Sequence, residues 1–337
     1  MSKEFTVGSL FAGIGGICSA FKGAGAKVIW ANEFDKKACE TYRHNFKDTT
    51  LYEEDIHNLK TEDVSNVDII TSGFPCQAFS IAGYRQGFND KKGRGNLFFE
   101  TARFIDKIRP EAYLLENVKN LANHDNGNTL SVIKKTIIND LEYSFIPFIL
   151  NSKDYGNIPQ TRERIYIVGF KNEANFNTES DVDNELRSSK FQIPTPIKLT
   201  NIIADLLDHD KKDDRFYYNK DHQYYPVLNA EMKRRDTIYQ WRRVYVRENK
   251  SNVCPTLTAN MGTGGHNVPL IIDNYGYRKL TPQECIRFQG FSDGFKFPEN
   301  MALSHCYKQA GNSVVVPVVQ RIAEEIIRVL RETELQY

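Results

Sequence analysis

The sequence predicts an α/β fold built on a doubly wound, mostly parallel β-sheet, with a second and smaller domain. Through the first half of the chain, short apolar runs rich in β-branched residues alternate with segments of helical spacing, which is the βαβ pattern. From about residue 171 the sequence becomes polar, and a basic, aromatic block covers about 215–250. A chain of 337 residues is long enough for two domains. We expect the first to cover 1–190 plus 301–337 and the second to cover 191–300.

The apolar runs define the expected strands in chain order. They are Phe5–Leu10, Lys27–Ala31, Val67–Thr71, Ala112–Leu115, Ile146–Leu150 and Ile165–Phe170. Helical spacing between them predicts helices such as 36–46 and 101–108. A last helix is expected from Pro317, which suits a first turn, and it should pack back on the first domain through one apolar stripe. That stripe consists of Val318, Val319, Ile322, Ile326, Ile327 and Leu330.

Composition narrows the class of protein. With 26% charged residues and no apolar stretch near the length of a membrane span, a membrane protein is excluded, and the N-terminus lacks the pattern of a signal peptide. The six cysteines contain no CxxC pair and no cysteine–histidine cluster with zinc spacing, so we expect free thiols, a cytoplasmic protein and no metal. The net charge is 44 − 43 = +1, so any affinity for nucleic acid must come from a local cluster.

A glycine-rich turn follows the first expected strand, at Phe11-Ala12-Gly13-Ile14-Gly15-Gly16. Such a turn lets the backbone approach a ligand and aims a helix N-terminus at it. Cys18 replaces the third glycine of the nucleotide fingerprint, so a purely structural turn is an equal alternative. Glu33, at the end of the second strand, favours a cofactor site because a carboxylate there accepts hydrogen bonds from a ribose. The alternative for Glu33 is a solvated surface position.

The third expected strand leads into Gly73-Phe74-Pro75-Cys76-Gln77. Most free cysteines are buried small hydrophobes, but this one lies where the fold exposes reactive groups, at the carboxyl edge of a parallel strand. The following segment, 78–96, has the composition of a mobile lid. Glu116 stands at the end of the next strand. The pattern therefore predicts a thiol and a carboxyl group in one cleft, as in covalent catalysis with acid assistance.

These residues resemble the DNA (cytosine-5)-methyltransferases, and the resemblance covers nearly the whole chain. The matched motifs follow in that family's order: 11–16, Pro75-Cys76-Gln77, Arg94-Gly95-x-Leu97-Phe98, Glu116-Asn117-Val118, Gln160-Thr161-Arg162-Glu163-Arg164, 278–291 and 309–315. The resemblance implies a Rossmann-like S-adenosylmethionine-dependent methyltransferase fold with a target-recognition domain. It also implies a bacterial or phage modification enzyme that acts as a monomer on duplex DNA, with a cognate restriction endonuclease as its functional partner.

The resemblance also assigns roles to residues. Cys76 would attack C6 of a cytosine flipped out of the duplex, while Glu116 holds N3 and the exocyclic amine and Arg164 contacts O2, with Arg162 beside it. A fold-stabilising role is the alternative for the two arginines. S-adenosylmethionine, which leaves as S-adenosylhomocysteine, would have its ribose on Glu33 and its adenine against Phe34 and Asp55. The whole predicted cofactor set is Phe11, Gly13, Gly15, Gly16, Glu33, Phe34, Asp55, Ile56, Asn312 and Val314.

The second domain should recognise the DNA sequence. Seven basic residues against two acidic ones between positions 233 and 250 give a local charge of +5, which attracts phosphates. Arg242, Arg243 and Arg247 lie there among aromatic residues, and arginine is the commonest reader of guanine, although some of them could be phosphate clamps. The segment 256–266 resembles the family's target-recognition turn. The predicted DNA contacts are Gln77, Ser80, Arg85, Gln86, Arg94, Arg242, Arg243, Arg247, Thr256, Thr258, Gly264 and Gly265.

One departure from the family concerns the flipped base. Some relatives carry a serine in the 78–96 segment that fills the gap in the duplex, where this chain has Ala82. Gln77, Arg85 and Gln86 are alternatives for that role.

Three other functions share part of this pattern. A nicotinamide-dependent oxidoreductase would leave Cys76, Glu116 and the basic block without a role. A catalytically inactive DNA-binding protein is expected to have lost the thiol or the acid. A transfer-RNA methyltransferase would use the same chemistry, but its usual Cys-Phe-Thr element is absent and the recognition region here is long.

Overall fold

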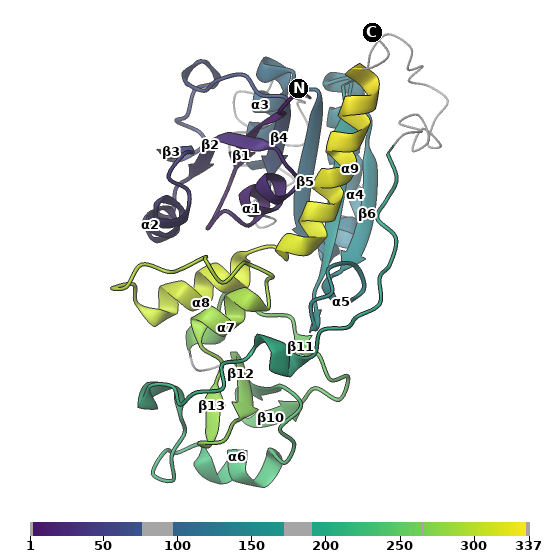
Figure 1. The fold of residues 1–337 in the computed structure, drawn as a ribbon. Coiled ribbons are helices and arrows are strands. Elements are labelled where there is room, and N and C mark those ends of the chain that lie inside the picture. The colour runs from purple at the N-terminus through teal and green to yellow at the C-terminus, as the bar shows by residue number, and fades with distance from the viewer. Residues whose placement is uncertain (1–2, 76–96, 172–190, 264–265, 335–337) are drawn as a thin grey trace.

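The computed structural model describes residues 3–75, 97–171, 191–263 and 266–334. Figure 1 shows a large lobe around one sheet, a smaller lobe around a second sheet, and two helices, α7 (Pro282–Arg287) and α8 (Leu303–Asn312), between them. The large sheet has the strand order β3-β2-β1-β4-β5-β8-β6. Its strands are β1 (Thr6–Leu10), β2 (Lys27–Glu33), β3 (Thr50–Glu53), β4 (Ile69–Ser72), β5 (Ala112–Val118), β6 (Ile146–Asn151) and β8 (Glu163–Phe170).

The sheet is mostly parallel, as predicted, and every expected strand is present. The exception to the parallel arrangement is β8, which lies between β5 and β6 and runs antiparallel to both. Pairing with β8 extends β5 three residues beyond the expected end, because Glu116 pairs with Tyr166 and Val118 with Arg164. Glu116 therefore lies inside a strand rather than in the loop that follows it, and at this position β5 is paired with β8.

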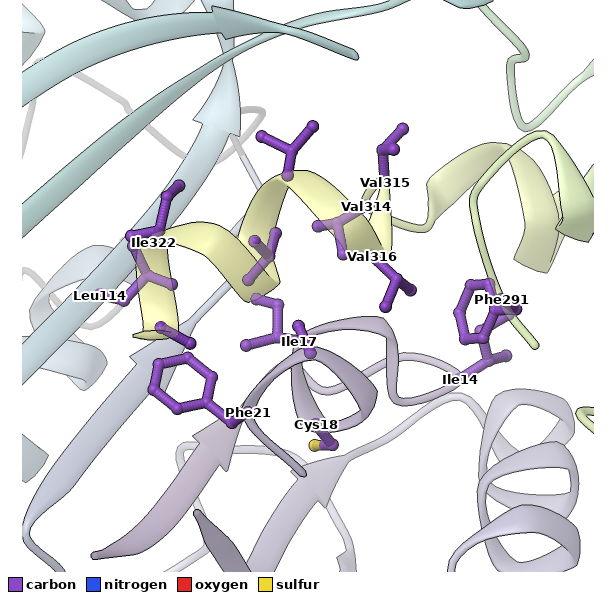
Figure 2. Packing of buried hydrophobic residues seen from close by; sticks show 14 of the residues in the cluster. Ile14, Ile17, Cys18, Phe21, Leu114, Phe291, Val314, Val315, Val316 and Ile322 are labelled. Carbon is purple, nitrogen blue, oxygen red and sulfur yellow. The ribbon is translucent and has the colours of Figure 1, made fainter. Parts of the chain in front are cut away.

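Helices cover both faces of the sheet, which makes the fold doubly wound. On one face, α1 (Gly16–Gly23), α2 (Lys36–Asn45) and α9 (Val316–Glu334) share a single apolar cluster with the strands. On the other face, α3 (Leu97–Ile108) and α4 (Asn128–Lys135) share a second one. The predicted stripe of α9 is buried throughout, and Figure 2 shows α9 beside α1, with Ile17 and Phe21 of α1 on the side that faces it. The last helix thus packs back on the N-terminal half, as expected.

The smaller sheet has the order β10-β9-β12-β13 and contains β9 (Tyr239–Arg242), β10 (Tyr245–Glu248), β12 (His266–Ile272) and β13 (Tyr277–Lys279). Helix α6 (Tyr225–Glu231) packs on it over a small core of its own, formed by Leu228, Met232, Tyr239, Trp241, Val246, Val268 and Leu270. A two-stranded parallel ribbon joins the lobes, in which β7 (Gln160–Thr161) pairs with β11 (Cys254–Pro255). The division at 190/191 and 300/301 stays a prediction.

The short helix α5 (Ser152–Tyr155), a π-helical turn at Thr136–Asp140 and 3-10 turns at Thr61–Asp63, Lys119–Gly127, Ile203–Leu206, Asp214–Phe216 and Met261–Thr263 complete the described elements. None of the described helices is long and apolar enough to span a membrane.

Candidate active site

The glycine-rich turn joins β1 to α1 at the carboxyl end of the sheet. Its backbone is left-handed at Phe11 (φ 52°), Gly13 (φ 56°) and Gly15 (φ 88°). A Cβ built on Gly13 would meet no atom within 4 Å, so this side of the turn is open. A Cβ on Gly16 would lie 2.7 Å from Oγ of Ser313 and 2.8 Å from Cγ2 of Val314, so only glycine lets the C-terminal segment approach so closely. The turn therefore has one open face and one face closed by the returning chain.

Glu33 ends β2 beside this turn and is buried. Its Oε2 accepts the backbone N–H of Gly13 at 2.8 Å, and its Oε1 accepts those of Phe34 at 2.9 Å and Asp35 at 2.8 Å. Burial raises the pKa of Glu33, and the three amides oppose that shift. The carboxylate thus ties the end of β2 to the glycine turn. The ring of Phe34, next to it, is 65% exposed and offers a free face to a ligand.

The remaining predicted cofactor residues lie after β3 and at the end of α8. The exposed Asp55 accepts the backbone N–H of His57 at 3.0 Å, a bond that lowers the pKa of Asp55, while Ile56 is buried. Asn312 is exposed at the end of α8, and Val314 is buried against Gly16.

Glu116 and the chain leading to Cys76 meet at the ends of two neighbouring strands. β4 and β5 are parallel with Ser72 opposite Leu115, which puts Gly73 level with Glu116. A Cβ on Gly73 would lie 3.6 Å from Oε2 of Glu116 and 3.9 Å from the backbone oxygen of Phe11. The carboxyl group and the glycine turn therefore border the same small space. Cys76 itself lies outside the described residues, as do Gln77, Ser80, Arg85, Gln86 and Arg94.

The carboxyl group of Glu116 is paired with a guanidinium. Nε of Arg164, on β8, lies 3.1 Å from Oε1 of Glu116, and the two side chains are only 16% and 12% exposed. Burial raises the pKa of Glu116, while the charges of Arg164 and Arg162 oppose that shift. Asn117, which sequence reasoning did not single out, donates a hydrogen bond from Nδ2 to the backbone oxygen of Phe74 at 2.8 Å. It fixes the segment before Cys76 to the end of β5.

A family model for C-5 cytosine-specific DNA methylases matches residues 5–328. The chain belongs to this family. It is 54% identical over 325 residues to the Type II methyltransferase M.Bsp6I of Bacillus sp. (strain RFL6), covering 96% of this chain and 98% of that protein. It is 39% identical over 330 residues to M.HhaI of Haemophilus parahaemolyticus, covering 94% and 92%. Among solved structures, a Spodoptera frugiperda DNMT2 mutant shares the fold with a TM-score of 0.70 at 20% identity, covering 97% of this chain and 99% of that one.

In this methylase, Arg162 lies away from solvent and binds backbone rather than carboxylates. It is 2% exposed, and its guanidinium donates to the backbone oxygen of Leu257 at 2.8 Å, of Gly311 at 3.1 Å and of Ser313 at 2.6 Å. Its Nε has no hydrogen-bond partner among the described residues. Arg162 therefore ties the ribbon between the lobes to the segment that closes the glycine turn, whereas Arg164 is the arginine that meets Glu116.

Gln160 is a second residue of this junction that sequence reasoning did not single out. It is fully buried, donates from Nε2 to the backbone oxygen of Phe288 at 2.6 Å and accepts the N–H of Leu257 at 3.0 Å. Its place in the Gln160–Arg164 motif could have marked it as important, but its role could not be read from the sequence because its partners are more than 90 residues away.

The described residues among the predicted DNA contacts lie on the β9–β10 hairpin and in the segment that follows β11. Arg243 and Arg247 are exposed on the β9–β10 hairpin, while Arg242 is half-buried. Thr256 donates its hydroxyl to the backbone oxygen of Thr161 in the ribbon, and Thr258 donates to Oδ1 of Asn260 at 2.7 Å. Gly264 and Gly265 lie outside the described residues. Within the described ranges, no group of three or more histidine, cysteine or acidic residues is placed to hold a metal ion.

Proposed function

We propose that this methylase flips a cytosine out of a specific duplex DNA sequence and transfers a methyl group from S-adenosylmethionine to its C5 atom. The observation that carries the proposal is the small space shared by the paired carboxyl group of Glu116, the segment leading to Cys76 and the glycine turn. A methyl donor and a base acceptor must meet at such a point for direct transfer.

The residues around the turn suit S-adenosylmethionine. The open side of Gly13 leaves room for a ligand, and Oε2 of Glu33 accepts a single N–H, which leaves acceptor capacity for a ribose hydroxyl. The exposed ring of Phe34 and the carboxylate of Asp55 suit an adenine, with Ile56, Asn312 and Val314 completing the pocket. When bound, S-adenosylmethionine supplies an electrophilic methyl group and leaves as S-adenosylhomocysteine.

The chain's own residues prepare the cytosine. The thiolate of Cys76 adds to C6, and Glu116 donates a proton toward N3, so the charge that develops on the ring is neutralised. C5 becomes nucleophilic and accepts the methyl group. A water molecule then takes the C5 proton, Cys76 leaves C6 as the thiolate, and N3 returns its proton to Glu116, which restores the ring. Flipping the base costs a few kcal/mol. The raised pKa of Glu116 supports a role as proton donor, and the 3.1 Å pairing of Arg164 with Glu116 supports a contact between Arg164 and the neighbouring O2 of the cytosine.

The biological role we propose is modification in a restriction-modification system, in the cytoplasm and as a monomer. Similarity to Type II methyltransferases along almost the full chain supports the modification role. A cognate endonuclease would cut the same sequence when it is unmethylated.

Incubation of the protein with labelled S-adenosylmethionine and either duplex DNA or transfer RNA tests the substrate. We expect label in DNA alone, at one sequence that bisulfite sequencing of DNA from expressing cells would identify. Label in transfer RNA alone would refute the proposal and favour the RNA enzyme.

The matched variant Cys76→Ser tests the nucleophile. Turnover should be abolished while binding to the target duplex is retained, since serine is a far weaker nucleophile of similar size. A variant that keeps full activity would exclude Cys76 from the chemistry.

A further inference from the structure

Arg242 differs from its two neighbours in the basic block because its guanidinium is held. Nη1 of Arg242 donates to Oδ1 of Asn267 at 2.8 Å, and the side chain is half-buried. Among the described residues the Arg242 guanidinium makes this one hydrogen bond, so Nε and Nη2 are left for a ligand. Arg243 and Arg247 are exposed on the hairpin. An arginine held in advance loses less side-chain entropy when it binds, and it binds in one orientation.

The backbone explains how Asn267 reaches Arg242. The pairing of β12 with β9 shifts register between His266 and Val268, so Asn267 occupies a bulge next to the His266–Arg242 pair. Its φ of 59° is left-handed, a conformation that asparagine tolerates better than most residues. Bulges commonly re-aim a side chain next to a functional site. Here the bulge brings the amide of Asn267 to the Arg242 guanidinium.

This pair lies at the end of the smaller sheet that faces the large lobe. The 3-10 turn Met261–Thr263 comes just before β12, and a Cβ on Gly262 would lie 2.6 Å from Cβ of Tyr307, so this turn packs tightly on α8. β9 and β13 both run antiparallel to β12, and β13 leads into α7 at this same end. Figure 1 shows α7 and α8 between the two lobes. A DNA duplex bound to the large lobe would therefore lie next to the end of the smaller sheet that carries Arg242.

We propose that Asn267 is a positioning residue that aims Arg242 at a guanine edge of the target sequence, whereas Arg243 and Arg247 contact phosphates. The inference rests on the proposed function, because it names the part of the smaller lobe that discriminates between DNA sequences. A guanidinium with two free donors matches the O6 and N7 acceptors of guanine in the major groove. Exposed arginines on the same hairpin supply charge without a fixed direction, which suits phosphate contacts.

The test compares methylation of duplex oligonucleotides that carry the target site, or the site with each base pair replaced in turn. Asn267→Gly removes the amide but tolerates the left-handed backbone, so it is the main variant. We expect it to relax discrimination at one G·C pair by about tenfold in kcat/KM, with unchanged affinity for S-adenosylmethionine. Asn267→Asp keeps the acceptor oxygen and should keep the discrimination. Arg242→Lys should relax the same G·C pair.

Arg243→Ala and Arg247→Ala are the matched controls. Each should lower kcat/KM by a similar factor on all sequences and reduce the salt dependence of binding by about one phosphate contact. The inference is overturned if Asn267→Gly keeps full discrimination, if Asn267→Asp loses it, or if Arg242→Lys relaxes a different base pair. These outcomes differ from failure of the proposed function, in which the unaltered protein would methylate no DNA sequence at all.

Discussion

Replacing Glu116 by glutamine removes one negative charge while keeping the size of the side chain. At 3.1 Å, unit charges on Glu116 and Arg164 attract by about 5 kcal/mol at an effective dielectric constant near 20. The cost of desolvating both groups offsets most of this attraction. The glutamine oxygen can still accept from Nε of Arg164, so we expect a stability loss of only about 1–2 kcal/mol.

The effect of Glu116→Gln on the reaction should be larger than its effect on stability. Glutamine cannot donate the proton that neutralises the ring, and at 12% exposure of the Glu116 side chain little water is available to replace it. Loss of one such interaction costs roughly 2.7–4 kcal/mol of transition-state stabilisation, or about a hundredfold to a thousandfold in kcat.

The assay is single-turnover methylation of the target duplex at saturating S-adenosylmethionine, with thermal unfolding measured in parallel. Glu163→Gln is the matched control, because Glu163 pairs with Lys119 at 3.0 Å on the surface, where the side chains are 40% and 50% exposed. An exposed pair contributes about 0–1 kcal/mol, so this control should react at the normal rate. A Glu116→Gln rate within threefold of the unaltered protein, in a folded variant, would refute the role given to Glu116.

Three further predictions concern the same site. Burial raises the pKa of Glu116 above its ordinary value of 4.5, so kcat/KM should fall as the pH rises through that raised value and the donor loses its proton; Glu116→Gln should lack this falling limb, and an identical limb in the variant would exclude Glu116 as its source. Glu33→Gln leaves at least one of three backbone amides unpaired, since an NH₂ group cannot accept a hydrogen bond. We expect a loss of about 1–3 kcal/mol in the free energy of unfolding, measured by thermal unfolding, and weaker S-adenosylmethionine binding in calorimetry. Unchanged values for both would contradict the role given to Glu33. Gly16→Ala brings a Cβ to within 2.7 Å of Oγ of Ser313, so it should lower the free energy of unfolding by about 1–3 kcal/mol and weaken cofactor binding. The control Gly294→Ala, whose Cβ would have its nearest neighbour 3.8 Å away, should change neither. Equal behaviour of the two variants would argue against close packing of Gly16 on Ser313.

The strands and the buried stripe of α9 were predictable because each depends on residues a few positions apart. β-branched runs favour strands wherever they pack, and apolar residues at helical spacing form one face of a helix. The error at the end of β5 has a different origin. Its last three residues, Glu116 to Val118, are polar or exposed, so their own pattern predicts a loop, and pairing with the antiparallel strand β8 keeps them extended.

The sequence by itself determined six strands of the large sheet and their order along the chain, the glycine turn after β1, and the carboxylates near the ends of β2 and β5. These features follow from short-range pattern and from the rule that strand ends in such sheets carry ligand-binding groups. Only the tertiary structure decided which arginine does what. Arg164 meets Glu116, while Arg162, two residues away, binds backbone oxygens 95 to 151 residues distant in the chain. Arg242 is held by Asn267, 25 residues away, whereas adjacent Arg243 is exposed. The physical reason is that a guanidinium binds whatever acceptor the packing of distant segments brings to it, and no local pattern encodes that choice.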